Sequence, residues 1–334
     1  MPRALPGLGR VDGHTVVQAR LEAGDVAVTL LSLGCITQDW RLDGQPVVLG
    51  YADPAGYLKN PNHFGVIAGR VANRTAGGRF MLDGKPVQLS VNDPPNHLHG
   101  GTRGLGARNW RMEGESGKSL RLSYHAPNGE EGYPGAVDFT VTITLAGHRL
   151  TYVMEAVPDR PTPINLAQHS YYNLTGGGPV WDHRLHIPAP HYTPVDANLV
   201  PTGEIAPTAG TRYDFTSPRT LEQADPDHLG SDINLVLGNG RDPGRPSATV
   251  EAGGLALRLW TDEPGLQLYN AMHLGLTPGG HDGQTYDRFH GLCLEPQHFP
   301  DSLHNPAFPT IICSPERPYR QTLTVEIAPK EVTR

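Results

Sequence analysis

The clearest hydrophobic pattern in the chain covers residues 137–145, where apolar and polar side chains alternate. In the sequence VDFTVTITL, valine, phenylalanine, isoleucine and leucine occupy every second position, with aspartate and threonine between them. A period of two over nine residues predicts a strand with one buried face and one solvated face. Shorter alternations of the same kind predict further strands at residues 120–124, 255–260 and 322–327. Strand patterns therefore occur along most of the chain.

Turn and helix signals support the same fold class. The sequence FMLDGKPVQL at residues 80–89 carries an Asp-Gly turn between two short apolar runs, which predicts a hairpin. Helical periodicity is not sustained over a dozen residues anywhere, and the best candidate, residues 217–226, is bounded by prolines. We expect a turn or two of helix there. Residues 178–231 and 238–250 are rich in Pro, Gly and Asp, which predicts long loops.

Composition narrows the architecture. Glycine (40 residues) and proline (32 residues) are frequent in this chain of 334 residues, which favours turns over long helices. No internal repeat of 20 to 50 residues is found, which argues against a propeller or a solenoid. Apolar residues continue through the predicted loops. We therefore expect an all-β fold, a large antiparallel β-sandwich with few short helices, forming a single domain over residues 1–334.

Charge and cysteine content exclude several classes of partner. The formal net charge is -7, without a run of Lys or Arg, so no surface for nucleic acid or for anionic lipid is predicted. No apolar run approaches the roughly 18 residues that a membrane span needs, and the first residues do not read as a signal peptide. The three cysteines form no CxxC or zinc-ribbon pattern. We expect a cytoplasmic protein, a monomer or a homodimer.

A first group of polar residues lies in the sequence GRVANRTAGGRF at residues 69–80. Arg70, Asn73 and Arg74 are hydrogen-bond donors beside small residues, an arrangement suited to holding hydroxyl oxygens. A solvated turn is the alternative interpretation of this stretch taken alone.

A second group is NDPPNHLHGG at residues 92–101, which places His97 and His99 two residues apart. On an extended chain the two side chains would point to the same side, as in a metal-binding pair, and EPQH at residues 295–298 could add ligands. No third converging ligand can be placed from the sequence. We therefore expect no metal site, and a binding or structural role for one of the two histidines.

Two further groups carry residues suited to proton transfer. His169, in NLAQHSYYNLTGGG, titrates near neutrality in its unperturbed state, which suits both giving and taking protons. Glu295 closes the apolar run GLCL, where its surroundings can tune a carboxylate for proton transfer. Asp232 and Gln267 lie in two other polar segments, and a turn or an ordinary strand face would explain each of them. Local sequence alone leaves structural roles open for all four.

Motifs for cofactors are missing from the sequence. The glycines of GTRGLGARN lack the strand and helix of a dinucleotide-binding unit, and neither a GxSxG elbow nor a Walker loop occurs. We expect no cofactor.

Taken together, the chain resembles the aldose 1-epimerase (galactose mutarotase) family. The resemblance rests on seven motifs that occur in the family's order and spacing between about residues 62 and 310: GRVANR, NHLHGG, GEEGYPG, QHSYYNL, SDINLVL, GLQLYN and LEPQHFPD. It implies a β-supersandwich domain and a cofactor-free interconversion of the α and β anomers of free aldoses such as galactose and glucose.

The resemblance also implies the roles of individual residues. His169 is expected to be the proton donor and Glu295 the proton acceptor. The expected sugar-binding residues are Asn73, Arg74, His99, Tyr171, Asp232 and Gln267. His97 is not the position that matches the family's binding histidine.

The implied residues suit the implied chemistry. Opening a hemiacetal ring requires a base for the C1 hydroxyl and an acid for the ring oxygen, and neither step requires redox or phosphoryl-transfer chemistry. The chain departs from many family members at Gln168, Ile233 and Leu235. A glycoside hydrolase using Glu295 and Asp232, and a non-catalytic sugar-binding module, are the alternatives. The preferred aldose is not determined by the motifs.

Overall fold

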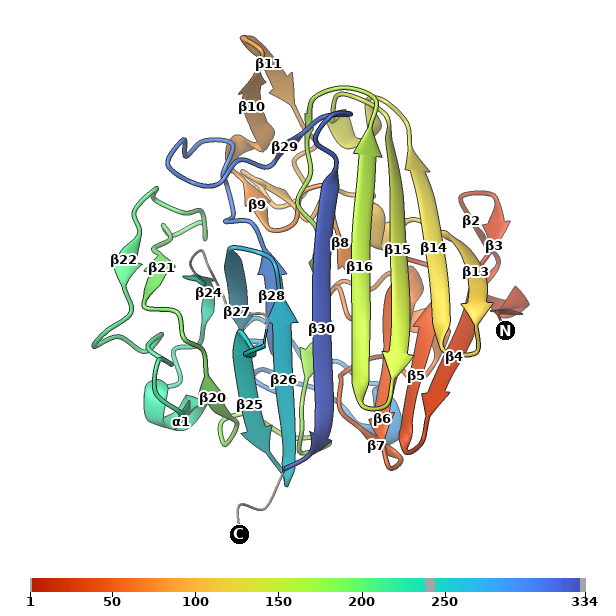
Figure 1. Ribbon diagram of the computed structural model, residues 1–334, viewed down its shortest axis with the longest axis vertical. Helices are drawn as coiled ribbons and strands as arrows, with labels where there is room; N and C mark the ends of the chain where they lie inside the picture. The colour runs from red at the N-terminus through yellow and green to blue at the C-terminus, as the bar shows by residue number, and fades with distance from the viewer. Residues whose placement is uncertain (1, 238–243, 331–334) are drawn as a thin grey trace.

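The computed structural model describes residues 2–237 and 244–330, and strands dominate them (Figure 1). The largest sheet has nine strands and runs across the front of the molecule in Figure 1. In spatial order its strands are β13 (Arg111–Ser116), β14 (Ser119–Ala126), β15 (Val137–Ala146), β16 (Arg149–Pro158), β30 (Tyr319–Pro329), β26 (Leu255–Thr261), β25 (Ala248–Ala252), β20 (Arg184–His186) and β23 (Arg219–Thr220).

Two smaller sheets lie behind the nine-stranded sheet (Figure 1). The six-stranded sheet has the order β19 (Tyr171–Tyr172), β28 (Leu292–Gln297), β27 (Gly265–Tyr269), β24 (Asp232–Val236), β21 (His191–Thr193) and β22 (Ala206–Pro207). The five-stranded sheet has the order β1 (Arg3–Ala4), β4 (Val17–Ala23), β5 (Val26–Leu31), β6 (Ile36–Leu42) and β7 (Gln45–Pro46).

Short strand pairs form separate two-stranded sheets outside these three larger ones. They are β2 (Arg10–Val11) with β3 (His14–Thr15), β8 (Ile67–Ala68) with β18 (Ala167–Gln168), β9 (Arg74–Thr75) with β12 (His97–Leu98), β10 (Arg79–Leu82) with β11 (Lys85–Gln88), and β17 (Thr162–Pro163) with β29 (Ile312–Cys313). One α-helix, α1 (Leu221–Ala224), occurs among the described residues. Short 3-10 helices are found at Pro6–Leu8, Pro54–Leu58, Ala76–Gly78, Leu105–Ala107, Glu130–Gly132 and His281–Gly283.

Alternating side chains explain how the layers pack. Along β15 every second residue is buried, and the residues between them are partly exposed, so one face of the large sheet turns inward. Its buried side chains share one apolar cluster with residues of both smaller sheets, including Trp40 from β6 and Leu294 from β28. The large sheet therefore covers the other two, and the core lies between these layers.

Most sequence predictions of secondary structure are confirmed. Strands occupy residues 137–145, 120–124, 255–260 and 322–327, and β10 and β11 form the predicted hairpin, joined by the Asp-Gly turn. Helix α1 spans a single turn inside residues 217–226, where the Thr220 side chain caps it. The all-β prediction is confirmed.

The predicted loop at residues 178–231 is only partly right. Four strands, β20 to β23, and α1 lie inside it, because two- and three-residue strands are too short to produce an alternating pattern. The second predicted loop, residues 238–250, overlaps the start of β25 and also includes residues outside those described. Within the described part of the chain, no helix is long and apolar enough to cross a membrane.

The packing of the large sheet can be tested at Phe139, a buried residue in the middle of β15. We expect Phe139→Ala to lower the free energy of unfolding by about 3–5 kcal/mol, because it removes a buried ring and leaves a cavity. Val157→Ala in β16, where the side chain is 53% exposed, serves as the control and should change it by less than about 0.5 kcal/mol. Urea denaturation measures both values, and equal effects would contradict the assigned core.

Candidate active site

Three neighbouring strands of the six-stranded sheet carry acidic and amide side chains. Glu295 on β28 pairs with Gln267 on β27, and Asp232 begins β24, the next strand along. Because side chains alternate between the faces of a strand, Cys293 and Glu295 share a face, and Leu294 packs into the core. The Gln267 Nε2 atom donates to Asp232 Oδ1 at 2.6 Å. The sheet therefore presents a row of oxygen-bearing groups on one surface.

His169 lies between the short strands β18 and β19, and backbone hydrogen bonds hold it in place. Its N–H donates to the carbonyl of Val66, and its own carbonyl accepts from Gly65. The imidazole ring stacks on the ring of Tyr171, with centroids 5.1 Å apart. The Tyr171 hydroxyl donates to the backbone carbonyl of Asn62. Both side chains are therefore fixed in direction.

The pair β9 and β12 brings a second segment to the same place. The Asn73 backbone N–H donates to His99 Nδ1 at 3.1 Å. Asn73 and His99 both adopt positive φ values, 59° and 50°. Gly100 follows in NHLHGG, and a Cβ there would collide with the backbone carbonyl of Gly69. The glycine thus permits the close approach that places His99 beside Asn73.

All eight predicted site residues line one pocket with a volume of about 210 Å³. They are Asn73, Arg74, His99, His169, Tyr171, Asp232, Gln267 and Glu295. Arg70, another candidate from the sequence, points elsewhere: its guanidinium donates to the carbonyls of Pro134 and Gly135. The structure therefore brings together residues that are more than 200 positions apart in the sequence.

The two groups suited to proton transfer face each other inside this pocket. His169 Nε2 lies 3.7 Å from Glu295 Oε1, and both side chains are buried. The other ring nitrogen, Nδ1, lies 3.7 Å from Cys293 Sγ. Nitrogen, sulfur and oxygen donors of these three residues lie within 4.8 Å of one another, so they could also hold a divalent cation such as Zn²⁺.

Burial shifts the pKa values of the facing pair in opposite directions. It lowers the pKa of His169 to about 3, with a further contribution from the nearby imidazole of His63. It raises the pKa of Glu295 well above its usual range, and the neighbouring Asp232 carboxylate adds to the effect. Each shift favours the neutral form. The interior of the pocket therefore favours an uncharged pair that holds one proton.

Two other pocket residues have shifted pKa values. Burial raises the pKa of Asp232, although Arg74 and the hydrogen bond from Gln267 oppose the effect. Burial also lowers the pKa of His99 well below its usual value, and the imidazoles of His63 and His169 contribute. His99 is therefore neutral near pH 7, and its Nδ1 atom is already occupied by the Asn73 N–H. Its Nε2–H is left as a hydrogen-bond donor.

His97 and His99 do not form the metal-binding pair that an extended chain would have allowed. Because His99 has a positive φ, the chain is not extended there, and the two rings have different partners. The His97 nitrogens contact the Tyr133 hydroxyl and the carbonyl of Ser90, which gives His97 a structural role. His298, the other suggested ligand, binds the carboxylate of Glu263 instead.

The departures from the family pattern lie outside the pocket lining. Ile233 and Leu235 belong to the apolar core, on the face of β24 opposite to Asp232. The Gln168 amide donates to the Ser170 hydroxyl and accepts from the backbone N–H of the same residue. All three side chains thus support the elements around the site.

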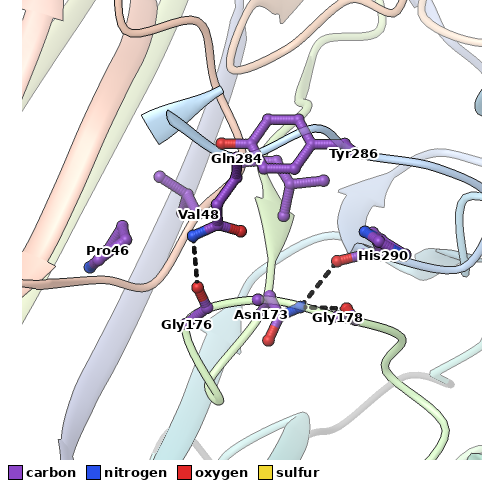
Figure 2. A pocket seen from close by; sticks show the side chains of 10 residues that line it. Pro46, Val48, Asn173, Gly176, Gly178, Gln284, Tyr286 and His290 are labelled. Atoms are coloured by element: carbon purple, nitrogen blue, oxygen red, sulfur yellow. Dashed lines mark hydrogen bonds between the residues drawn. The ribbon is translucent and has the colours of Figure 1, made fainter. Parts of the chain in front are cut away.

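The glycines after the histidine motif form a turn next to a second, much smaller cavity (Figure 2). The Asn173 side-chain amide donates to the carbonyls of Gly178 and His290, and the Gln284 amide donates to that of Gly176. This cavity measures about 10 Å³, so it could hold no more than a water molecule. The glycine turn follows β19 and is not part of the pocket that contains His169.

Sequence reasoning missed several residues of the pocket. They are Pro61, Asn62, His63, Leu98, Tyr269 and His273. The His63 ring lies 4.9 Å from that of His99 and 6.1 Å from that of His169, between centroids. No local pattern identifies it. In contrast, the alternation in GLCLEPQ would have placed Cys293 beside Glu295.

The destabilising effect of the buried carboxyl can be tested with Glu295→Gln. A carboxyl whose pKa is raised on folding costs stability above its unfolded pKa, and the cost grows as the pH rises toward the folded value. We expect the variant to melt at a higher temperature than the wild type at pH 8, and the difference to shrink by pH 4. Calorimetry at both pH values measures it.

Glu326→Gln is the matched control. Burial acts to raise the pKa of Glu326, but hydrogen bonds from Arg149 and Arg258 outweigh it and hold the pKa below its usual value. This variant should therefore melt at a lower temperature than the wild type at pH 8. A lower melting temperature for Glu295→Gln as well would contradict the electrostatics described for the pocket.

Comparisons with known proteins agree with this geometry. The family described as aldose 1-epimerase matches residues 18–326. The chain is 39% identical over 321 residues to galactose mutarotase of Pongo abelii, covering 93% of each chain, and 32% identical to aldose 1-epimerase of Escherichia coli K12, covering 90% of this chain and 85% of that protein. The crystal structure of an aldose epimerase homologue from C. elegans superposes with a TM-score of 0.88 at 28% identity, covering 94% of this chain and all of that one.

The matched region includes every residue of the pocket and all three large sheets except β1, the first residue of β4 and the end of β30. The β-sandwich predicted from the sequence is thus the fold of these relatives. The chain belongs to the aldose 1-epimerase family.

Proposed function

We propose that the protein interconverts the α and β anomers of a free aldose, with Glu295 as the base and His169 as the acid. The observation that carries the proposal is the 3.7 Å approach of His169 Nε2 to Glu295 Oε1 inside a pocket of about 210 Å³. That volume suits a single sugar ring. The names of the relatives, galactose mutarotase and aldose 1-epimerase, support the same reaction.

The reaction follows from the positions of the two groups. Glu295 takes the proton of the C1 hydroxyl while His169 gives a proton to the ring oxygen, so the bond from C1 to the ring oxygen breaks and an aldehyde forms. Rotation about the C1–C2 bond then presents the other face of the aldehyde. Ring closure reverses both transfers: the attacking hydroxyl gives its proton to His169, and Glu295 gives its proton to the carbonyl oxygen at C1.

The shifted pKa values fit this cycle. In the open-chain intermediate Glu295 is protonated and His169 is neutral, which is the state that burial favours for both groups. The pair carries one proton before and after ring opening, so no external proton is needed. The pair that begins ring opening, ionised Glu295 with protonated His169, is therefore disfavoured in the empty pocket, and the transfer of both protons relieves the cost of burying the two charges.

The remaining residues hold the sugar while C1 turns. We propose that Arg74, Asn73 and His99 donate hydrogen bonds to ring hydroxyls, and that Asp232 and Gln267 bind hydroxyls on the opposite side. Tyr171 forms a wall of the pocket under the His169 ring. All of these residues come from one chain. Because β30 pairs with strands from both halves, we propose that the chain acts as one domain.

The two alternative functions fit the site less well. A glycoside hydrolase that used Glu295 and Asp232 would leave the buried His169, in direct contact with the carboxylate, without a role. A sugar-binding module would not need an acid and a base that are costly to bury. Anomer exchange gives a function to all eight predicted site residues.

The acid and the base can be tested by substitution. We expect His169→Ala and Glu295→Ala each to lower kcat/KM by roughly 10²- to 10⁴-fold, the usual contribution of a general acid or base. The measurement is the decay of optical rotation of freshly dissolved α-D-galactose, α-D-glucose and α-D-xylose. His148→Ala, at a half-exposed histidine outside the pocket, should behave like the wild type. Near wild-type rates in either pocket variant would overturn the assignment.

The metal-ligand geometry leads to a separate prediction. Since proton transfer between side chains and sugar requires no metal, we expect a chelator to leave the wild-type rate unchanged. Added Zn²⁺ should inhibit in competition with sugar, because it would occupy His169, Cys293 and Glu295.

Cys293→Ser should weaken the inhibition by Zn²⁺, when the rate of this variant with Zn²⁺ is divided by its own rate without Zn²⁺. Cys313→Ser, at a buried cysteine of β29, should leave it unchanged. Loss of activity with the chelator, restored by metal, would contradict the acid and base mechanism.

A further inference from the structure

Asn165 lies where the three segments that carry the site meet. The first segment leads to Asn73 and Arg74, the second runs from Asn165 to His169, and the third runs from Glu295 to His298. Asn165 is 1% exposed and does not line the pocket. It opens the sequence NLAQHSYYNL, which also contains His169 and Tyr171.

The backbone of Asn165 binds the first segment. Its N–H donates to the carbonyl of Arg70 at 3.0 Å, and its carbonyl accepts from the N–H of Ala72 at 2.7 Å. These bonds fix the residues that immediately precede Asn73 and Arg74. They also form the parallel bridge between Val71 and Asn165.

The side chain of Asn165 binds the third segment at two points. Its Nδ2 atom donates to the carbonyl of His298 at 3.1 Å, and its Oδ1 atom accepts from the N–H of His298 at 3.0 Å. The amide thereby pairs with both backbone polar groups of His298, as a residue on a neighbouring strand would. His298 lies three residues after Glu295, and Asn165 lies four residues before His169.

We propose that Asn165 is a positioning residue, which sets the distance between His169 and Glu295 by clamping the two segments that carry them. This inference rests on the proposed function for its effect on rate. Few other side chains could take the place of Asn165. The clamp needs a donor and an acceptor on one short planar group, and among side chains of this length only asparagine offers both.

A second connection joins the same two segments, and it begins at Leu166, the residue after Asn165. The backbone N–H of Leu166 donates to the Tyr319 hydroxyl, which donates to Gln321 Oε1 at 2.7 Å. The Gln321 amide in turn donates to the carbonyl of Pro296, the residue after Glu295. Tyr319 and Gln321 are buried. The same two segments are thus joined twice, at Asn165 and through β30.

Asn165→Asp tests the proposal because it keeps the shape and removes one donor. When it is ionised, the new carboxyl group also faces the carbonyl of His298, so the clamp should open. Because burial can keep a carboxyl group protonated, and a protonated carboxyl group could still donate, the rates are measured up to pH 9. A displacement of about 1 Å can cost roughly 10²-fold in rate. We therefore expect kcat for anomer exchange to fall by roughly 10- to 100-fold, with KM changing by less than about threefold.

Asn109→Asp is the matched control. Asn109 is also buried and makes comparable side-chain hydrogen bonds, to the hydroxyl of Ser32 and to the carbonyls of Val11 and His14, but it lies outside the pocket. We expect it to lose thermal stability and to keep kcat within about twofold of the wild type. If Asn165→Asp also loses only stability, the positioning role is wrong.

Two more measurements keep the outcomes distinct. The ring ¹⁵N signals of His169 report its pKa without any turnover. We expect Asn165→Asp to raise that pKa toward the ordinary value, because water would enter the pocket. Asn109→Asp should leave the pKa of His169 unchanged. Should Asn165→Asp fail to fold, Tyr319→Phe replaces it, with the same expected direction in kcat and in the pKa. An inactive wild type would refute the proposed function, whereas an unchanged His169 pKa and kcat would refute the clamp alone.

Discussion

The approach of an imidazole and a carboxyl group to 3.7 Å inside the protein is the contact on which the rest of the structure depends. Both charged forms lose hydration there, and the opposite pKa shifts of His169 and Glu295 record the cost. A fold that accepts such a pair must hold it by other means. The large core between three sheets provides the stability, and the fixed backbone around both residues prevents them from separating or turning toward solvent.

The two sides of the pocket are fixed in different ways. Glu295, Gln267 and Asp232 project from three paired strands, so the sheet spacing sets their separation. The opposite side is built from two-residue strands and turns, in which Asn73 and His99 have positive φ values. Such segments have little stability of their own. They are held by hydrogen bonds to one another, which explains why a buried amide such as Asn165 occurs among them.

The sequence predicted the parts of the structure that produce a local signal. Long half-buried strands such as β15 alternate visibly, and the Asp-Gly turn marks the hairpin. The two-residue strands between β20 and β23 leave no pattern, because their pairing depends on distant residues. The eight pocket residues were found through a resemblance over the whole chain. His63 escaped because nothing local distinguishes it, whereas the alternation in GLCLEPQ could have placed Cys293 beside Glu295. The positive φ at His99, which separates its ring from that of His97, also has no local signal in the sequence.

The departures from the family pattern bear on which sugar the pocket accepts. Galactose and glucose differ in the direction of one hydroxyl, so one side chain can decide between them. Ile233 and Leu235 cannot be that side chain, because both pack into the core. Of the pocket residues outside the predicted set, Asn62 donates through its side-chain amide to the Thr277 hydroxyl, and its backbone carbonyl accepts from the Tyr171 hydroxyl. The rings of His63 and His273 and the hydroxyl proton of Tyr269 also line the pocket, so they add to the polar groups of the predicted set that a sugar hydroxyl can contact.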